Sequence, residues 1–244
     1  MCFSATASFS AGVGLLLNGA VAARRVQQPQ QWPCALIPTL FGVQQLVEGG
    51  LWLTLPDKAP LCSMVLTQVF SGFSQVLWPV CIPLAVFLLE PTPWRRTVLL
   101  GTTVGGATVG GATVALFLLV AMFRHPVVAA LKENHIQYVF PHLRKATATT
   151  LYLLGACASP LLSSHRMLQL FGLASCLSLV AAYALYSNWF ISVWCFFAAV
   201  LSAVVLLYFP ARRRIRLVEP IRMPPNSPRQ QHQLPWVSAC PSQW

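Results

Sequence analysis

The side chain with the clearest chemical potential in this sequence is the carboxyl of Glu48. It is the one acidic residue in the long apolar segment 34–55. Gln44 and Gln45 precede it by four and three positions and Trp52 follows by four, so all of them share one helix face. A carboxyl inside a membrane span is costly, usually faces a bundle interior and is a candidate functional group. A network in which protonated Glu48 only joins helices accounts equally well for the pattern.

Other polar residues are expected at a similar depth. Gln68, Ser71 and Gln75 share one face of the next apolar segment, and tyrosines occur in later segments. We therefore expect a polar pocket that binds a proton or a small molecule and is formed by Glu48, Gln44, Gln45, Gln68, Gln75, Tyr152 and Tyr183. Glutamines in membrane helices also form purely structural hydrogen bonds, and for Gln68 and Gln75 this interpretation is the stronger one.

The long loop 124–145 offers a second chemistry, because it contains three histidines. A set made of His135, His142 and Glu48 would suit zinc, and a zinc-activated water would act as a hydrolase on lipid. The spacing matches no recognised ligand signature. A solvated loop whose histidines respond to pH explains them at least as well.

The composition indicates what must position these groups. The chain has 244 residues, of which 56% are hydrophobic and 9% charged. Soluble domains carry about 25% charged residues. The run 189–209 holds no charge and is long enough to cross a hydrocarbon core of about 30 Å. The sequence predicts an all-α integral membrane bundle rather than a soluble domain.

We expect about seven transmembrane helices within one domain, residues 1–209. Their expected ranges are 3–23, 34–55, 61–89, 97–123, 147–163, 167–186 and 189–209. The fifth is short and contains Pro160; without it the count is six and the later topology inverts. Pro79 and Pro83 are expected to kink the third helix, because each removes a backbone donor.

Positive charges between the expected spans set the orientation. Nine arginines fall on one side and five basic residues on the other. The denser side is Arg24, Arg25, Arg95, Arg96, Arg166, Arg212, Arg213, Arg214 and Arg216. The N terminus is therefore expected outside and the C terminus in the cytoplasm, in a plasma or inner membrane.

Residues 210–244 are expected to form a disordered, proline-rich cytoplasmic tail. Its first basic residues would attract anionic lipid headgroups at about 1 kcal/mol each; they are Arg212, Arg213, Arg214 and Arg216. Basic clusters of this kind also follow ordinary transmembrane helices, so the cluster is not a specific lipid-binding signal. The net charge of +11 does not indicate nucleic acid binding, because the basic residues lie at span ends and in this tail.

Small residues and cysteines add two structural expectations. Glycines at four-residue spacing in 97–123 favour close helix packing, within the chain or less plausibly in a dimer. Of the eight cysteines, only Cys2 and Cys62 fall near the expected outer surface, where they could form a disulfide.

Known seven-helix classes are disfavoured. Lysines occur only at positions 58, 132 and 145, so no last-helix lysine could attach retinal. The acidic-Arg-Tyr and Asn-Pro-x-x-Tyr motifs of receptors coupled to G proteins are missing, as are the in-span ligands of seven-helix zinc hydrolases.

The sequence resembles an uncharacterised family of multi-pass membrane proteins over most of 1–209. The resemblance rests on the opening Met-Cys-Phe-Ser-Ala, on Gln-Gln-x-x-Glu-Gly-x-x-Trp ending at Trp52, and on segments 77–84, 163–172 and 192–197. No activity comes with it. Three functions stay open: a small-molecule or proton-linked transporter or sensor, which we favour; a metal-dependent lipid hydrolase; and a structural partner in a membrane complex.

Overall fold

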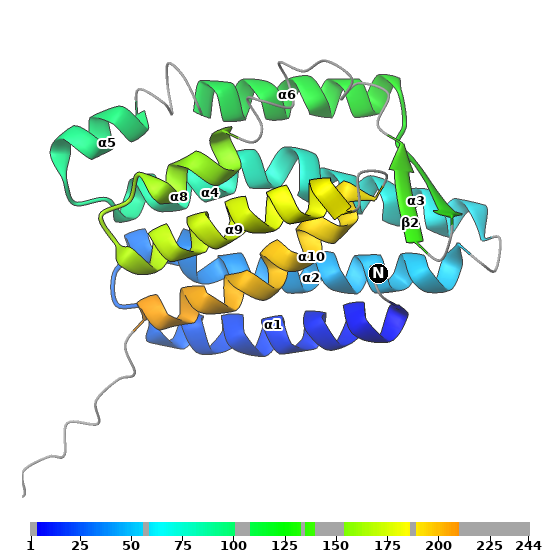
Figure 1. Ribbon diagram of the computed structural model, residues 1–244, viewed down its shortest axis with the longest axis horizontal. Coiled ribbons are helices and arrows are strands. Elements are labelled where there is room, and N and C mark those ends of the chain that lie inside the picture. Colours follow the sequence, from blue (N-terminus) through cyan, green and yellow to red (C-terminus); the bar gives the residue numbers. More distant parts are fainter. Residues whose placement is uncertain are drawn as a thin grey trace, which may run out of the picture. The chain divides into compact units, whose positions relative to one another are not determined.

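The structure, a computed structural model, consists mainly of helices with one short β-hairpin (Figure 1). It describes residues 4–55, 59–100, 108–132, 135–139, 154–185 and 189–209. The helices are α1 Ala5–Arg25, η1 Pro29–Gln31, α2 Trp32–Thr54, α3 Pro60–Ser71, η2 Gly72–Leu77, α4 Trp78–Leu89, α5 Pro93–Leu100, α6 Thr108–Arg124, η4 Leu154–Ala158, α8 Ser159–Leu161, α9 Arg166–Leu185, α10 Phe190–Ser202 and η5 Ala203–Tyr208.

The observed helices follow the apolar segments of the sequence. α1, α2, the continuous stretch from α3 to α4, α9 and the stretch from α10 to η5 begin and end within two residues of the expected ranges. The range 97–123 contains α5 and α6, with 101–107 outside the described residues. Of the expected fifth helix, the structure describes only the part from Leu154 onward.

Among the described residues, four helical stretches are long and apolar enough to cross a membrane by length and composition. They are Ala5–Arg25, Pro60–Leu89, Arg166–Leu185 and Phe190–Tyr208. α2 is 23 residues long but is not among them, because Gln44, Gln45 and Glu48 lower its apolar content. All three of those polar side chains are fully buried, so α2 serves as an internal helix of the bundle.

α1 and α2 pack closely through glycines, as small residues allow in membrane helices. A methyl group added at Gly42 would lie 3.0 Å from the backbone oxygen of Gly12, and one at Gly19 would lie 2.9 Å from the backbone nitrogen of Thr39. The two backbones therefore have no room for larger side chains at these points. This contact lies outside the glycine-rich range 97–123, the expected packing face.

The helix from α3 to α4 contains a wide π-helical segment, η2, directly before Trp78 and Pro79. Such segments often lie at functional sites. Pro79 has no backbone N–H, which is consistent with the predicted irregularity at this point. The segment leaves Ser74, Gln75 and Trp78 buried toward the bundle interior.

The segment 124–145, which we expected to be a long solvated loop, contains two antiparallel strands. β1 Val128–Lys132 pairs with β2 His135–Val139, with Val128 opposite Val139 and Lys132 opposite His135. β1 lies against α3 and β2 lies against α10 (Figure 1). We call the end of the bundle where α2 ends and α3 and α10 begin the hairpin end.

The close approach of α1 and α2 gives a matched pair of substitutions. Gly19→Ala should lower the free energy of unfolding by about 1–3 kcal/mol, the usual cost of overpacking. Gly14→Ala, on the same helix with open space around it, should be neutral or stabilise by up to about 1 kcal/mol. Thermal or denaturant unfolding in detergent measures both. Equal effects would contradict the described α1–α2 contact.

Candidate functional site

Glu48 lies in the middle of the bundle with its carboxyl fully buried. The Ser192 hydroxyl, 144 positions away on α10, donates a hydrogen bond to Oε1. Gln45 Nε2 donates to Oε2 at 3.4 Å. Within the described part of the chain no basic side chain forms an ion pair with it, so hydroxyl and amide dipoles alone compensate its burial.

Gln44 is held on the same face of α2. The indole Nε1 of Trp78 donates to Gln44 Oε1 at 2.7 Å, and the Trp78 ring stacks on Phe41 with centroids 3.7 Å apart. The Gln44 amide nitrogen lies beside the Cys195 thiol, which is a weak acceptor. An aromatic pair therefore fixes the orientation of a buried amide next to Glu48.

Several buried amide atoms lack a nitrogen or oxygen hydrogen-bond partner among the described residues. They are Oε1 of Gln45, beside Glu48 on α2, and Oε1 of Gln75 on η2, while Nε2 of Gln44 has only the weakly accepting Cys195 thiol beside it. A buried polar atom left unpaired costs about 1–3 kcal/mol. Native proteins rarely tolerate several such atoms together, so these unpaired atoms call for a ligand, a proton rearrangement or water.

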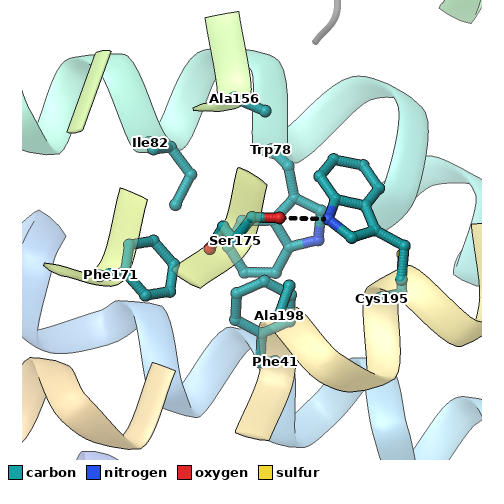
Figure 2. A pocket seen from close by; sticks show the side chains of 9 residues that line it. Phe41, Trp78, Ile82, Ala156, Phe171, Ser175, Cys195 and Ala198 are labelled. Carbon is teal, nitrogen blue, oxygen red and sulfur yellow. Dashed lines mark hydrogen bonds between the residues drawn. The ribbon is translucent and has the colours of Figure 1, made fainter. Parts of the chain in front are cut away.

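A cavity of about 30 Å³ lies next to this polar group. Its wall is formed by Phe41, Trp78, Ile82, Ala156, Phe171, Ser175, Trp194, Cys195 and Ala198 (Figure 2). The dashed line in Figure 2 is the bond from the Trp194 indole to the Ser175 backbone oxygen, 3.3 Å. A water needs about 10–15 Å³ of such volume. The space therefore suits one or two molecules of water size.

The wall of the cavity contains one side-chain hydroxyl, that of Ser175, without a hydrogen-bond partner among the described residues. Ser175 is only 4% exposed. Cys195 connects this wall to the polar group, because it also adjoins Glu48. A buried acid, amide atoms without strong hydrogen-bond partners and a small aromatic-lined cavity therefore lie next to one another.

The other expected pocket residues lie in different places. Gln75 is buried, but Gln68 donates its side-chain N–H to the backbone oxygen of Val127 at 2.9 Å. Tyr183 is 67% exposed and contacts the edge of Phe190, so it does not converge on Glu48. Tyr152 lies outside the described residues.

The expected zinc set is only partly described. His135 lies on β2, where its ring contacts Trp189 with centroids 4.4 Å apart. His142 is outside the described residues. Among the residues that are described, no group of three metal-ligating side chains comes together.

Cys62 is exposed and has no disulfide partner among the described residues, and Cys2 lies outside them, so the disulfide between the two stays a prediction. The lipid-binding arginines also lie outside; they are Arg212, Arg213, Arg214 and Arg216.

A second polar network, around Glu90, was not foreseen from the sequence. Glu90 follows the last residue of α4 and is 3% exposed. It accepts hydrogen bonds from the backbone N–H of Thr92 at 3.2 Å, from the backbone N–H of Ser164 at 2.7 Å and from the Ser164 hydroxyl. Burial raises the pKa of Glu90, but these bonds outweigh it and hold the pKa below its ordinary value.

This network joins the end of α4 to the start of α9. Arg95 Nη1 and Gln169 Nε2 both donate to the backbone oxygen of Ser163, at 3.0 and 2.7 Å. His165 Nε2 lies 3.1 Å from the backbone oxygen of Leu89. Its members satisfy one another, which indicates a structural joint rather than a binding site.

Comparison with known proteins gives a family without an activity. The model described as "Family of unknown function (DUF6629)" matches residues 1–220. No curated protein and no solved structure matches the chain. The expectation of an uncharacterised family is confirmed, while the membrane character of that family stays a prediction.

Glu90 gives a pH-dependent prediction. Its lowered pKa stabilises the fold above the unfolded carboxyl pKa of about 4.3. That contribution is lost as the pH falls through the lower folded pKa. Glu90→Gln should lower stability at pH 7 by about 1–3 kcal/mol, the usual cost of a lost hydrogen bond to a charged group.

Below about pH 4 the difference in free energy of unfolding between wild type and Glu90→Gln should become smaller. Unfolding midpoints across pH 3–7 measure it. A difference in stability that is constant over this range would mean that the charge of Glu90 does not stabilise the network between α4 and α9.

Proposed function

Since this chain belongs to the DUF6629 family, a family of unknown function, we propose its function from its own residues. It is an integral membrane protein of seven transmembrane helices that binds a proton or a small hydrogen-bonding molecule at Glu48. It works as a proton-linked transporter or as a sensor.

One observation carries the proposal: a fully buried carboxyl lies beside amide atoms that its own network leaves unpaired. A purely structural network pairs its members, as the Glu90 joint does. Beside Glu48, Gln45 has an unpaired amide oxygen and Gln44 has an amide nitrogen held only by the weakly accepting Cys195 thiol, and the group adjoins a cavity. These available hydrogen-bonding atoms support a site that binds a proton or a small molecule.

The membrane part of the proposal rests on composition and on four apolar helical stretches. α2, buried by its neighbours, and the shorter apolar helix Ala115–Arg124 would complete the bundle together with the segment that ends at Leu161. We propose the N terminus outside and the C terminus in the cytoplasm, in a plasma or inner membrane. The arginines from Arg212 to Arg216 would meet anionic headgroups.

The alternatives have less support. A zinc hydrolase would need His142 next to His135 and Glu48, and His135 is engaged with Trp189. A structural partner role would use the segment 97–123, of which residues 101–107 lie outside the described residues. Neither alternative gains an observation of its own from the described residues.

Tryptophan fluorescence tests the Glu48 site, because Trp78 is bonded to Gln44 and lines the cavity. Wild-type protein should show a reversible change in emission with pH, and Glu48→Gln should lose most of it. Glu90→Gln, which removes the other buried carboxyl that the structure describes, should keep the change. Retention of the full change in Glu48→Gln would refute the proposed proton site.

Native cysteines test the orientation. Cys62 is exposed at the hairpin end, proposed to face outside, and Cys240 belongs to the proposed cytoplasmic tail. A membrane-impermeant thiol reagent should label Cys62 in intact cells and Cys240 only after permeabilisation. The reverse pattern would invert the proposed topology.

A further inference from the structure

The hairpin formed by β1 and β2 covers the polar group that contains Glu48. Ile136, at the centre of β2, has no exposed surface. It belongs to one buried cluster with Leu51, Phe70 and Cys195. Leu51 lies three residues beyond Glu48 on α2, and Cys195 lies three beyond Ser192 on α10. The Ile136 side chain therefore sits over the same two helix faces that hold the buried carboxyl.

The described contacts between the hairpin and the helices lie mostly on one side of the hairpin. The Tyr138 ring stacks on Phe70 with centroids 4.6 Å apart, and Gln68 donates to the backbone oxygen of Val127. His135 contacts Trp189. In contrast to Ile136, four of the five residues of β1 are exposed. A two-stranded hairpin is marginally stable by itself, so its position depends on its contacts with the helices.

We propose that the hairpin is a lid for the Glu48 site, with Ile136 as its plug, and that the site opens at the hairpin end when β2 lifts. This proposal gives the regulation of the site described under the proposed function and rests on it. Ile136 suits this role because a fully buried acid that binds a proton or a small molecule, as proposed for Glu48, needs a route to water. Regions held by few buried contacts open at the lowest free energy.

Cys195 provides a native reporter for the lid, because it is 3% exposed and lies in the cluster beneath Ile136. Site-resolved mass spectrometry can follow its reaction with a small, water-soluble thiol reagent in the purified full-length protein. Ile136→Ala should raise the Cys195 labelling rate about tenfold, and Ile136→Val should give a smaller rise. The matched control is Val139→Ala, on the same strand with a side chain 51% exposed, and it should leave the rate unchanged.

Two other cysteines serve as internal standards. Cys62 is exposed and should react at the same rate in every variant. Cys34 is fully buried in a different cluster and should stay unreactive. An unchanged Cys195 rate in Ile136→Ala contradicts the lid. A parallel rise at Cys34 also contradicts it, because the whole bundle would then have loosened.

This experiment is independent of whether Glu48 binds anything. If Ile136→Ala speeds Cys195 labelling while Glu48→Gln leaves the fluorescence change intact, the lid stands and the proposed proton site fails. If the fluorescence change depends on Glu48 but Cys195 labelling does not depend on Ile136, the site stands and the lid fails.

Discussion

The burial of a single carboxyl is the constraint on which the rest of this structure depends. Glu48 has no exposed surface and no basic partner among the described residues, so its stability depends on hydrogen bonds from Ser192 and Gln45. Moving a carboxyl out of water costs several kcal/mol unless such partners are in place. The bundle must therefore hold α2 and α10 in one fixed relation.

Other features follow from that requirement. α1 packs against α2 through Gly12, Gly19 and Gly42, which leaves the glutamine-bearing face of α2 turned inward. The π-helical segment η2 leads into Trp78, whose indole orients Gln44. At the hairpin end, Ile136 seals the group from water. At the other end, the Glu90 network ties α4 to α9 without an unpaired carboxyl oxygen.

The bounds of the long apolar helices and the burial of Glu48 could be predicted from the sequence, because each carries a strong local signal. An acid in an apolar segment is conspicuous, whereas its partner Ser192 is an ordinary serine 144 positions away. The hairpin was missed because the sequence between Lys132 and His135 lacks the glycine-containing pair that marks a tight turn. Glu90 was missed because an acid at the end of a span is normally solvated. Tyr183 is exposed rather than turned toward Glu48, because helical depth does not fix the direction of a side chain.

A double-mutant cycle on Glu48 and Ser192 tests the central contact most directly. Unfolding free energies are measured for wild type, Glu48→Leu, Ser192→Ala and the double variant. If the hydroxyl compensates the buried carboxyl, each single change removes the same bond, and the double change costs less than the sum by about 1–3 kcal/mol. Costs that add to within about 0.5 kcal/mol would show that the two groups do not interact.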